Sequence, residues 1–334
     1  MKSGIKSIIK NKEIILILLT ILFVCSFFLS VANGAVKVSP AEIVKSIFFK
    51  EQNINYQIIW NVRLPRTLVA ALVGICLSLS GAILQGIMRN PLAGPNIIGV
   101  SSGAGLFALI ILILFPEYYY LVPMGAFVGA LFATLFIYIL AWKEGAQPTR
   151  LVLAGVAVAS LFSAGNNALM TFFPDRVSGV LGFMVGGLSA VQWQDFKMIL
   201  PYTIVGVLLV MFLPNKLNIL MLGDEVATGL GLNIERTRFY FIILSSLLAG
   251  SAVSVVGLLG FVGLIVPHIA RIFIGSDYKY LFPAAILLGG SIVMICDTLS
   301  RVLFAPMEIP VGIIMSAIGA PFFLYLLRVR GENR

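Results

Sequence analysis

Long apolar runs recur along this chain, at lengths that only a lipid bilayer requires. A helix needs about 20 consecutive apolar residues to cross the hydrocarbon core, and runs of this kind follow one another from Ile14 to Leu327 with short polar breaks between them. Only 11% of the 334 residues are charged, whereas a soluble domain usually carries about 25%. The sequence therefore predicts an all-α, multi-pass membrane protein with a single transmembrane domain over residues 1–334.

About ten of these segments are expected to span the membrane, with short connections and no large extramembrane domain. The expected spans are residues 14–32, 67–88, 97–115, 121–142, 151–172, 195–213, 239–259, 263–274, 282–303 and 309–327. The first run follows a basic head, and an uncleaved first helix is favoured over a cleaved signal peptide. The other expected features are loops at 35–61, with a short helix, and at 275–281, and a short re-entrant or interfacial helix within 173–194.

The basic residues are unevenly divided between the two sides of this topology. With the N-terminus inside, 15 of the 23 Lys and Arg residues fall on the inner side. Short cytoplasmic loops carry an excess of Lys and Arg, so both termini are expected in the cytoplasm. Arg63, Arg66 and Arg301 then lie on the outer side, where topology alone does not explain them.

The longest polar interruption of the second half covers residues 214–238. Its middle, residues 225–232, is expected to form a short helix with Val226 and Leu230 on one face. Gly223 and Gly231 bracket this helix and are expected to end it on each side. Flanking charges keep this apolar face out of lipid, so the segment either caps its own bundle or docks another protein. The charge bias puts it in the cytoplasm.

Motifs for catalysis and nucleotide binding are missing from the sequence. There is no G-x-x-x-x-G-K-[ST] loop, no H-E-x-x-H and no G-x-S-x-G. With one histidine and no Cys/His cluster, no metal or haem is expected to be held by this chain alone. Only Asp297 is a clearly intramembrane carboxylate, which disfavours a proton-driven carrier. The net charge of +9 fits cytoplasmic loops and anionic lipid rather than nucleic acid.

Several polar residues have more than one interpretation. Asp297 and Arg301, four residues apart, form an intrahelical pair or position the arginine at the outer mouth. Arg63 and Arg66 either extend to lipid head groups or, with Arg301, form sockets for acidic residues of an external partner. For His268, a bond to a backbone carbonyl is favoured over a proton relay. Candidate amides for a polar path, or for bridging helices, are Gln85, Asn90, Asn166, Asn167 and Gln192.

A faint repeat in the spacing of glycine and proline suggests two related halves. The matching triplets, 176 residues apart, are Gly81, Pro91 and Gly99, and Gly257, Pro267 and Gly275. In the assigned topology these would be inverted repeats, a common plan among transporters.

Taken in order, the motifs of the chain resemble one family. The matching segments are RLPR at 63–66, GAILQG at 81–86, RNPLA at 89–93, GDE at 223–225 with Ala227, Leu230 and Gly231, GFVGL at 260–264, Pro267, His268 and Arg271, Asp297 with Arg301, EIPVG at 308–312, and GAPFF at 319–323. Together they resemble the FecCD/BtuC-like permease subunits of ABC importers for iron–siderophores, haem and vitamin B12. The resemblance covers nearly the whole chain from Arg63 onward, although Ile309 stands where leucine is usual.

This resemblance implies a set of partners in a bacterial cytoplasmic membrane. They are a second permease copy or paralogue, two cytoplasmic ATP-binding subunits that hold ATP and magnesium, an extracellular substrate-binding protein, and a metal-chelate substrate. It also implies ten helices per subunit, with short coupling helices between spans six and seven. The residues of this chain that resemble the ATPase-coupling element are Gly223, Asp224, Glu225, Val226, Ala227, Leu230 and Gly231. The positions of Arg63, Arg66 and Arg301 resemble those of arginines that meet acidic residues on the two lobes of the binding protein.

The resemblance also implies an alternating-access mechanism, in which closure of the ATPase dimer moves the coupling element. A gate is expected near Gln147, Pro148 and Thr149, with Gln85 and Asn90 as further path candidates, whereas Asp297, His268 and Arg271 are interpreted as structural. The path walls are expected to tolerate different shapes, so that specificity resides mostly in the binding protein. The alternative is a stand-alone secondary transporter or channel. These motifs do not distinguish siderophore, haem and cobalamin substrates, or identical from different permease copies.

Overall fold

The computed structural model describes residues 12–34, 54–96, 99–142 and 148–331. Within these ranges, seven helices are long and apolar enough to cross a membrane. They are α2 (Lys12–Ala32), α5 (Leu64–Ile87), α7 (Val122–Ala141), α8 (Pro148–Phe172), α10 (Trp193–Phe212), α13 (Ile234–Val256) and α15 (Tyr278–Val302). Each lies on an expected span, so the apolar runs predicted these helices correctly.

The remaining helices are shorter apolar segments and connections. The apolar ones are α6 (Val100–Leu114), α14 (Val262–Ile274) and α16 (Val311–Gly331), whose apolar stretch is Val311–Leu324. The connecting ones are α4 (Ile54–Ile58), η1 (Ile59–Arg63), η2 (Pro116–Leu121), η3 (Pro174–Arg176), α9 (Val177–Val185), α11 (Pro214–Met221) and α12 (Asp224–Gly229). The short helix expected between the fifth and sixth spans is α9.

The two expected loops have different outcomes. The short helix expected within 35–61 is present as α4, which continues through η1 into α5, and residues 35–53 lie outside the described part of the chain. The expected loop at 275–281 is only three residues long, because α15 already begins at Tyr278. The side chain of Asp277 caps this helix by accepting a hydrogen bond from the backbone N–H of Lys279.

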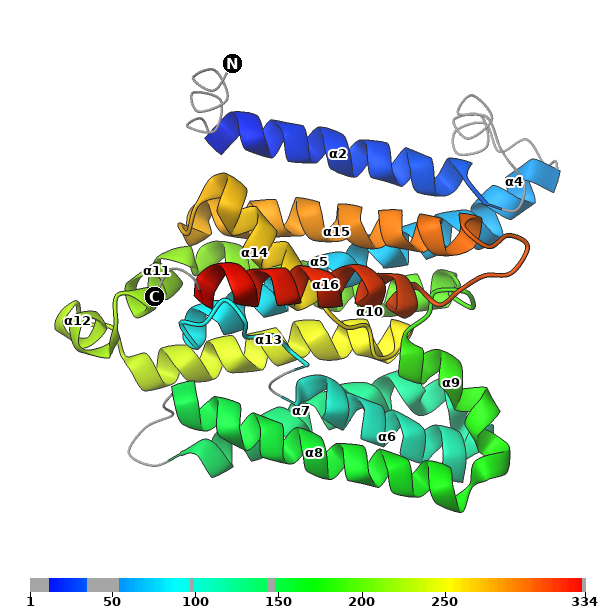
Figure 1. Cartoon of the computed structure of the whole chain (residues 1–334), viewed down its shortest axis with the longest axis horizontal. Coiled ribbons are helices and arrows are strands. Elements are labelled where there is room, and N and C mark those ends of the chain that lie inside the picture. The colour runs from blue at the N-terminus through cyan, green and yellow to red at the C-terminus, as the bar shows by residue number, and fades with distance from the viewer. Residues whose placement is uncertain (1–11, 35–53, 97–98, 143–147, 332–334) are drawn as a thin grey trace.

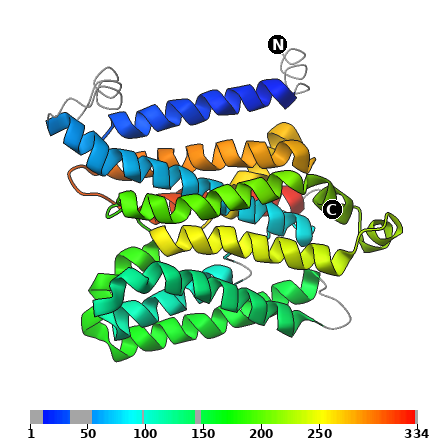
Figure 2. The same ribbon diagram turned by 180° about the vertical axis from the view of Figure 1, so that it is seen from behind.

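The long helices run side by side, with α5 in the centre (Figures 1 and 2). Of its 24 residues 21 are buried, and it packs against α15, α13, α14 and α10. On one flank α2 lies against α15, and on the other α6, α7 and α8 form a group that α13 joins to the centre. Helix α5, which carries Arg66 in its first turn, is therefore the most buried of the long helices.

Close approach of α5 to its neighbours depends on glycine. A Cβ atom on Gly81 would overlap the backbone of Gly263 in α14, and one on Gly74 would overlap the backbone of Gly289 in α15. Small residues allow helices to approach closely in lipid, where packing supplies much of the association energy. These two crossings set the spacing of α5, α14 and α15.

The glycine–proline spacing does not mark equivalent places in two halves. Gly81 lies inside α5 and Pro91 in a turn, whereas Gly257 ends α13 and Pro267 lies inside α14. The argument from this spacing was therefore wrong, because such residues serve turns in one place and helix contacts in another. The inverted repeat itself stays a prediction.

The two ends of the bundle differ in what they carry. The start of α2 and the end of α16 lie at the same end as α11 and α12 (Figure 1). The opposite end carries α4, α9 and the connection from α15 to α16. This places residues 214–238 and residues 63–66 at opposite ends of the molecule, as the assigned topology requires.

Candidate functional site

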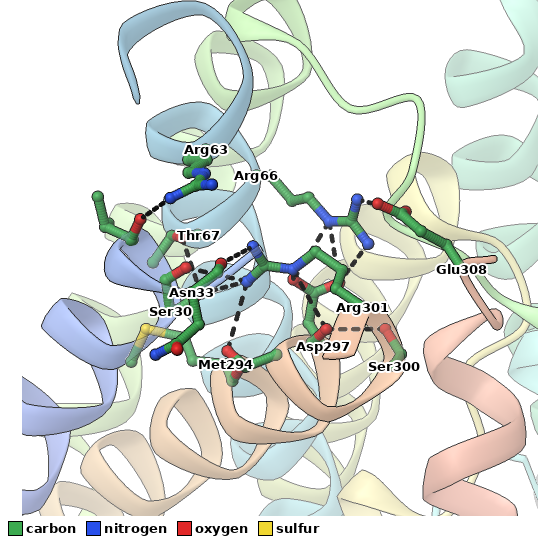
Figure 3. A network of polar contacts seen from close by, with 12 residues as sticks. Ser30, Asn33, Arg63, Arg66, Thr67, Met294, Asp297, Ser300, Arg301 and Glu308 are labelled. Carbon is green, nitrogen blue, oxygen red and sulfur yellow. Dashed lines mark hydrogen bonds and ion pairs between the residues drawn. The ribbon is translucent and has the colours of Figure 1, made fainter. Parts of the chain in front are cut away.

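Two arginines share one carboxylate (Figure 3), that of Asp297, which is fully buried at the end of the bundle that carries α4 and α9. Arg66 of α5 donates hydrogen bonds from Nε and Nη2 to Asp297 of α15, with donor–acceptor distances of 2.9–3.2 Å. Arg301, one turn further along α15, places its Nε 3.1 Å from the same carboxylate. The expected intrahelical pair of Asp297 and Arg301 is therefore present, but it is shared with α5.

The other donors of this arginine cluster (Arg63, Arg66 and Arg301) are also engaged inside the chain. Arg63 donates to the backbone carbonyls of Val31 and Ala32, both at 3.0 Å. Arg66 also pairs with Glu308, a half-exposed residue of the connection before α16, at 2.8 Å.

Arg301 in turn donates to the carbonyls of Asn33 and Ser30, at 2.8 and 3.0 Å. The cluster thus fastens α2, α5 and α15 together. All three arginines are no more than 5% exposed, so they do not extend to lipid head groups. The structure brings the three residues together, and their role in docking stays a prediction.

A cavity of about 710 Å³ lies among α6, α8 and α16. Helix α6 contributes Ser101 and Ser102, and α16 contributes Ser316. Helix α8 contributes Ser163, Asn166 and Asn167. No charged side chain is among the lining residues in the described part of the chain.

A second hollow of about 540 Å³ continues along α8 and shares Asn96, Ser163 and Asn167 with the cavity. Two of the five amides singled out from the sequence, Asn166 and Asn167, therefore line this space. The serines of the lining were not predicted from the sequence. The available signal was the helical spacing of Ser160, Ser163 and Asn167, which places them on one face of α8.

The remaining amide candidates lie elsewhere. Gln85 is buried between α5 and α14, where it donates to the carbonyl of Leu264 at 3.1 Å and accepts from Arg271 at 2.9 Å. Asn90 is exposed, and its side chain accepts a bond from the N–H of Leu92 within the turn after α5. Gln192 is the N-cap of α10, in a capping box with Asp195.

The expected gate and the histidine are also away from the cavity lining. Gln147 lies outside the described residues, Pro148 begins α8, and Thr149 is exposed in its first turn. The ring of His268 lies against that of Phe322 in α16, with centroids 6.1 Å apart. Neither His268 nor Thr149 is among the residues that line the two hollows.

The polar segment at the other end of the bundle forms a short, fixed helix. Helix α12 begins after Gly223 and is followed by Gly231, which have φ of 107° and 79°, values that suit glycine. It ends at Gly229, three residues before the end expected from the sequence. The two glycines therefore mark the limits of the helix, as the breaker argument predicted.

One face of α12 is held and another is exposed. Asp224 pairs with the buried Arg238 of α13 at 2.8 Å and with Arg89 at 3.5 Å, and Ala227 is fully buried. By contrast, Val226 and Leu230 are 50% and 60% exposed. Glu225 beside them is also exposed. An anchored helix thus presents an apolar pair with a carboxylate next to it.

Asp277 fixes the neighbouring junction of α11 and α15. It accepts a hydrogen bond from the side chain of Asn218 at 2.8 Å and one from the N–H of Lys279 at 3.1 Å. Partial burial acts to raise the pKa of Asp277, but these bonds and the charges of Lys12 and Lys279 outweigh it and lower the pKa below its ordinary value. The charged form of Asp277 is therefore favoured in the folded protein.

These features define a class of protein. A bundle of membrane-length helices with an uncharged polar cavity between them is the architecture of a multi-pass membrane protein. The chain belongs to the FecCD transport family, whose profile matches residues 20–329.

Individual relatives cover almost the whole chain. It is 42% identical over 321 residues to the Fe(3+)-citrate import system permease protein YfmE of Bacillus subtilis, a match that covers 96% of each chain. It is 40% identical over 290 residues to the hemin transport system permease protein HmuU of Yersinia pestis, over 83% of this chain and 85% of that protein. Its fold is similar to that of a metal-chelate type ABC transporter solved in an inward-facing conformation, with a TM-score of 0.84, 29% identity, and coverage of 94% of this chain and 98% of that one.

Proposed function

We propose that this chain is the permease subunit of an ABC importer that moves a metal chelate across a bacterial cytoplasmic membrane. The observation that carries the proposal is the whole-length similarity to an Fe(3+)-citrate import permease, together with the fold of a metal-chelate type ABC transporter. The sequence adds that the chain has no nucleotide-binding loop of its own. ATP and magnesium would therefore be held by separate subunits.

The cavity among α6, α8 and α16 is the proposed substrate path. Its volume of about 710 Å³ falls in the range of small-molecule sites, about 300–1,000 Å³. Its wall comes from different helices, so that relative movement of these helices would change its shape and access. A substrate can shift this movement only through a difference in its affinity for the two states.

In this proposal all ten apolar helices cross the membrane. Helices α6 and α14 have 15 and 13 residues, which at 1.5 Å per residue span about 20 Å. This is shorter than a typical hydrocarbon core of about 30 Å, and local thinning of the bilayer or the protein around them accommodates the difference. The end with α11 and α12 would face the cytoplasm, and with it both termini.

Helix α12 is the proposed contact with the ATP-binding subunits. Val226 and the C-cap residue Leu230 form its exposed apolar pair, with Glu225 beside them, and Asp224 ties it to α13 and to the turn after α5. A push on α12 would therefore reach the central helix. Two such permease chains, two ATP-binding subunits and an external binding protein at the end with the arginine cluster would make the complete importer.

Reconstitution tests this function. The chain would be purified with its ATP-binding subunits and its binding protein, placed in proteoliposomes, and assayed for uptake of radiolabelled ferric chelates. We expect uptake that requires both ATP and the binding protein. Uptake by the permease chain alone, driven by an ion gradient, would overturn the proposal in favour of a secondary transporter.

A further inference from the structure

Helix α11 lies between α12, the proposed contact with the ATP-binding subunits, and the central helices. It directly precedes α12 in the chain, and it packs against α12, α5 and α15. Its residues Leu217 and Leu220 are fully buried. The side chain of Leu217 is so close to α5 that a Cβ atom on Gly86 would lie 2.9 Å from it. A displacement of α12 can therefore reach α5 and α15 through α11.

Asn218 of α11 holds the start of α15 with both ends of its amide group. Its Nδ2 donates a hydrogen bond to the carboxylate of Asp277 at 2.8 Å, and its Oδ1 accepts one from the backbone N–H of Tyr278 at 3.0 Å. Asp277 is the N-cap of α15, and Tyr278 is its first residue. Hydrogen bonds depend on both distance and angle, so α15 cannot slide or turn against α11 without breaking one of the two.

The start of α15 is joined in turn to α5. The hydroxyl group of Tyr278, a residue that is only 1% exposed, donates to the backbone carbonyl of Ala82 at 3.2 Å. Near the far end of α15, Asp297 pairs with Arg66 of α5 at 2.9 Å. Helices α5 and α15 are thus connected at both ends of the bundle, and we expect them to move together.

Helix α15 also reaches one wall of the cavity. Helix α16 packs against α15 and α14, and it supplies Ser316 to the lining. The facing wall comes from α6 and α8, which pack against each other and against α7. A displacement of α15 that carries α16 with it would therefore change the separation of the two walls.

We propose that Asn218 is a positioning residue for transport, which makes α15, and with it the α16 wall of the cavity, follow α11 when the ATP-binding subunits move α12. This inference rests on the proposed function, because it names the joint through which these subunits act on the path. Without the two bonds of Asn218, the subunits still bind at α12 and hydrolyse ATP, but the wall no longer follows. Asn218 thus sets how much chelate is moved per ATP, and not whether the importer assembles.

The test measures uptake and ATP hydrolysis together in the complete importer in proteoliposomes. The probes are ferric citrate, a ferric trihydroxamate and haemin, and the one that wild-type importer takes up fastest is used for the variants. Asn218→Leu is similar in size but has no hydrogen-bonding atoms in its side chain. We expect it to lower the ratio of chelate moved to ATP hydrolysed by at least about five-fold, the factor to which one lost hydrogen bond corresponds. The ATP-binding subunits should still co-purify.

An exchange of the two side chains separates this joint from a general effect on folding. Asn218→Asp sets a second carboxylate against Asp277, and it should lower the same ratio. The double variant Asn218→Asp/Asp277→Asn restores one amide and one carboxylate, with acceptors for the N–H groups of Tyr278 and Lys279, and should regain most of the ratio. The matched control is Asn215→Leu, since Asn215 is exposed on the same helix; it should keep the wild-type ratio.

The outcomes distinguish this inference from the proposed function. If wild-type importer shows no ATP-dependent uptake of any probe, the proposed function fails. If wild type transports a probe and assembled Asn218→Leu importer keeps the wild-type ratio, the function stands and the inference is overturned. Equal losses in Asn218→Leu and Asn215→Leu would overturn it as well. A double variant that is coupled no better than Asn218→Asp would also overturn it, and this comparison decides the question if Asn218→Leu does not assemble.

Discussion

Arg66 in the first turn of α5 and Asp297 near the end of α15 form a buried ion pair, with Nη2 2.9 Å from the carboxylate oxygen. The two residues are 231 positions apart, and Arg301 shares the same carboxylate. Two buried cations thus share one buried anion. Removing one partner from a buried pair typically costs about 3–5 kcal/mol, because the remaining charge is left uncompensated.

Asp297→Ala should therefore be among the most destabilising substitutions at this end of the bundle. It leaves Arg66 and Arg301 buried side by side without their shared carboxylate, and we expect a loss of at least about 3 kcal/mol in the free energy of unfolding. The protein level in the membrane and the melting temperature in detergent measure this. The double variant Arg66→Leu/Asp297→Leu removes one cation together with the anion, so it should be less damaged than Asp297→Ala. A double variant at least as unstable as Asp297→Ala would contradict the role of charge.

Glu308→Gln tests whether the arginine cluster docks an external protein. Glu308 is the half-exposed partner of Arg66, and its loss as an anion leaves the Nη1 donor of Arg66 available for a carboxylate from outside. If the cluster is a docking site, capture of the binding protein should become tighter and more sensitive to salt. Glu117→Gln removes the same charge from an exposed residue of η2 and should have no effect. Unchanged capture in Glu308→Gln would count against docking by Arg66.

The sequence predicted the helices far better than the contacts between them. Apolar runs located the long helices because their length is dictated by the bilayer, and the breaking glycines located the limits of α12. Glu308 was not foreseen as the partner of Arg66, since the pairing joins distant parts of the chain.

The serine-lined cavity was missed for the same reason. Ser163 and Ser316 line one space only after α8 and α16 pack together. The alternation of small polar residues along one face of α8 was the available signal, but a polar face in lipid fits a helix contact equally well.

Gly81→Ala should disrupt the packing of α5. A methyl group at this position would overlap the backbone of Gly263, and neither helix backbone can yield as a side chain can. We expect a loss of more than about 3 kcal/mol, beyond the usual range of an overpacked core, seen as a low melting temperature in detergent. Gly179→Ala in α9 is the control, because no atom lies within 4 Å of its Cβ position. Alanine there should be neutral or slightly stabilising.

Asp277 should contribute to stability in a pH-dependent way. Asp277→Ala removes the cap of α15 and should cost about 1 kcal/mol at neutral pH, whereas Asn is almost as good a cap as Asp. The folded-state pKa of Asp277 is lowered, so the extra stability of the charge is fully present above the unfolded pKa, about 3.9. It is lost as the pH falls through the folded value. Melting temperatures of wild type and Asp277→Asn should therefore differ at pH 7 and converge below about pH 4, and a constant difference would contradict the charge contribution.

Val226→Asp should uncouple the permease from its motor without unfolding it. Val226 is half exposed on α12, so a carboxylate there costs little in the isolated chain, but it would be desolvated in an apolar contact with another protein. We expect co-purification of the ATP-binding subunits to fall at least ten-fold, and Glu225→Arg to act in the same direction. Thr228→Asp adds the same charge two residues later, on another side of the helix, and should bind the subunits normally. Normal assembly and ATP-dependent uptake in Val226→Asp would show that the motor contacts the permease elsewhere, and that α12 only caps its own bundle.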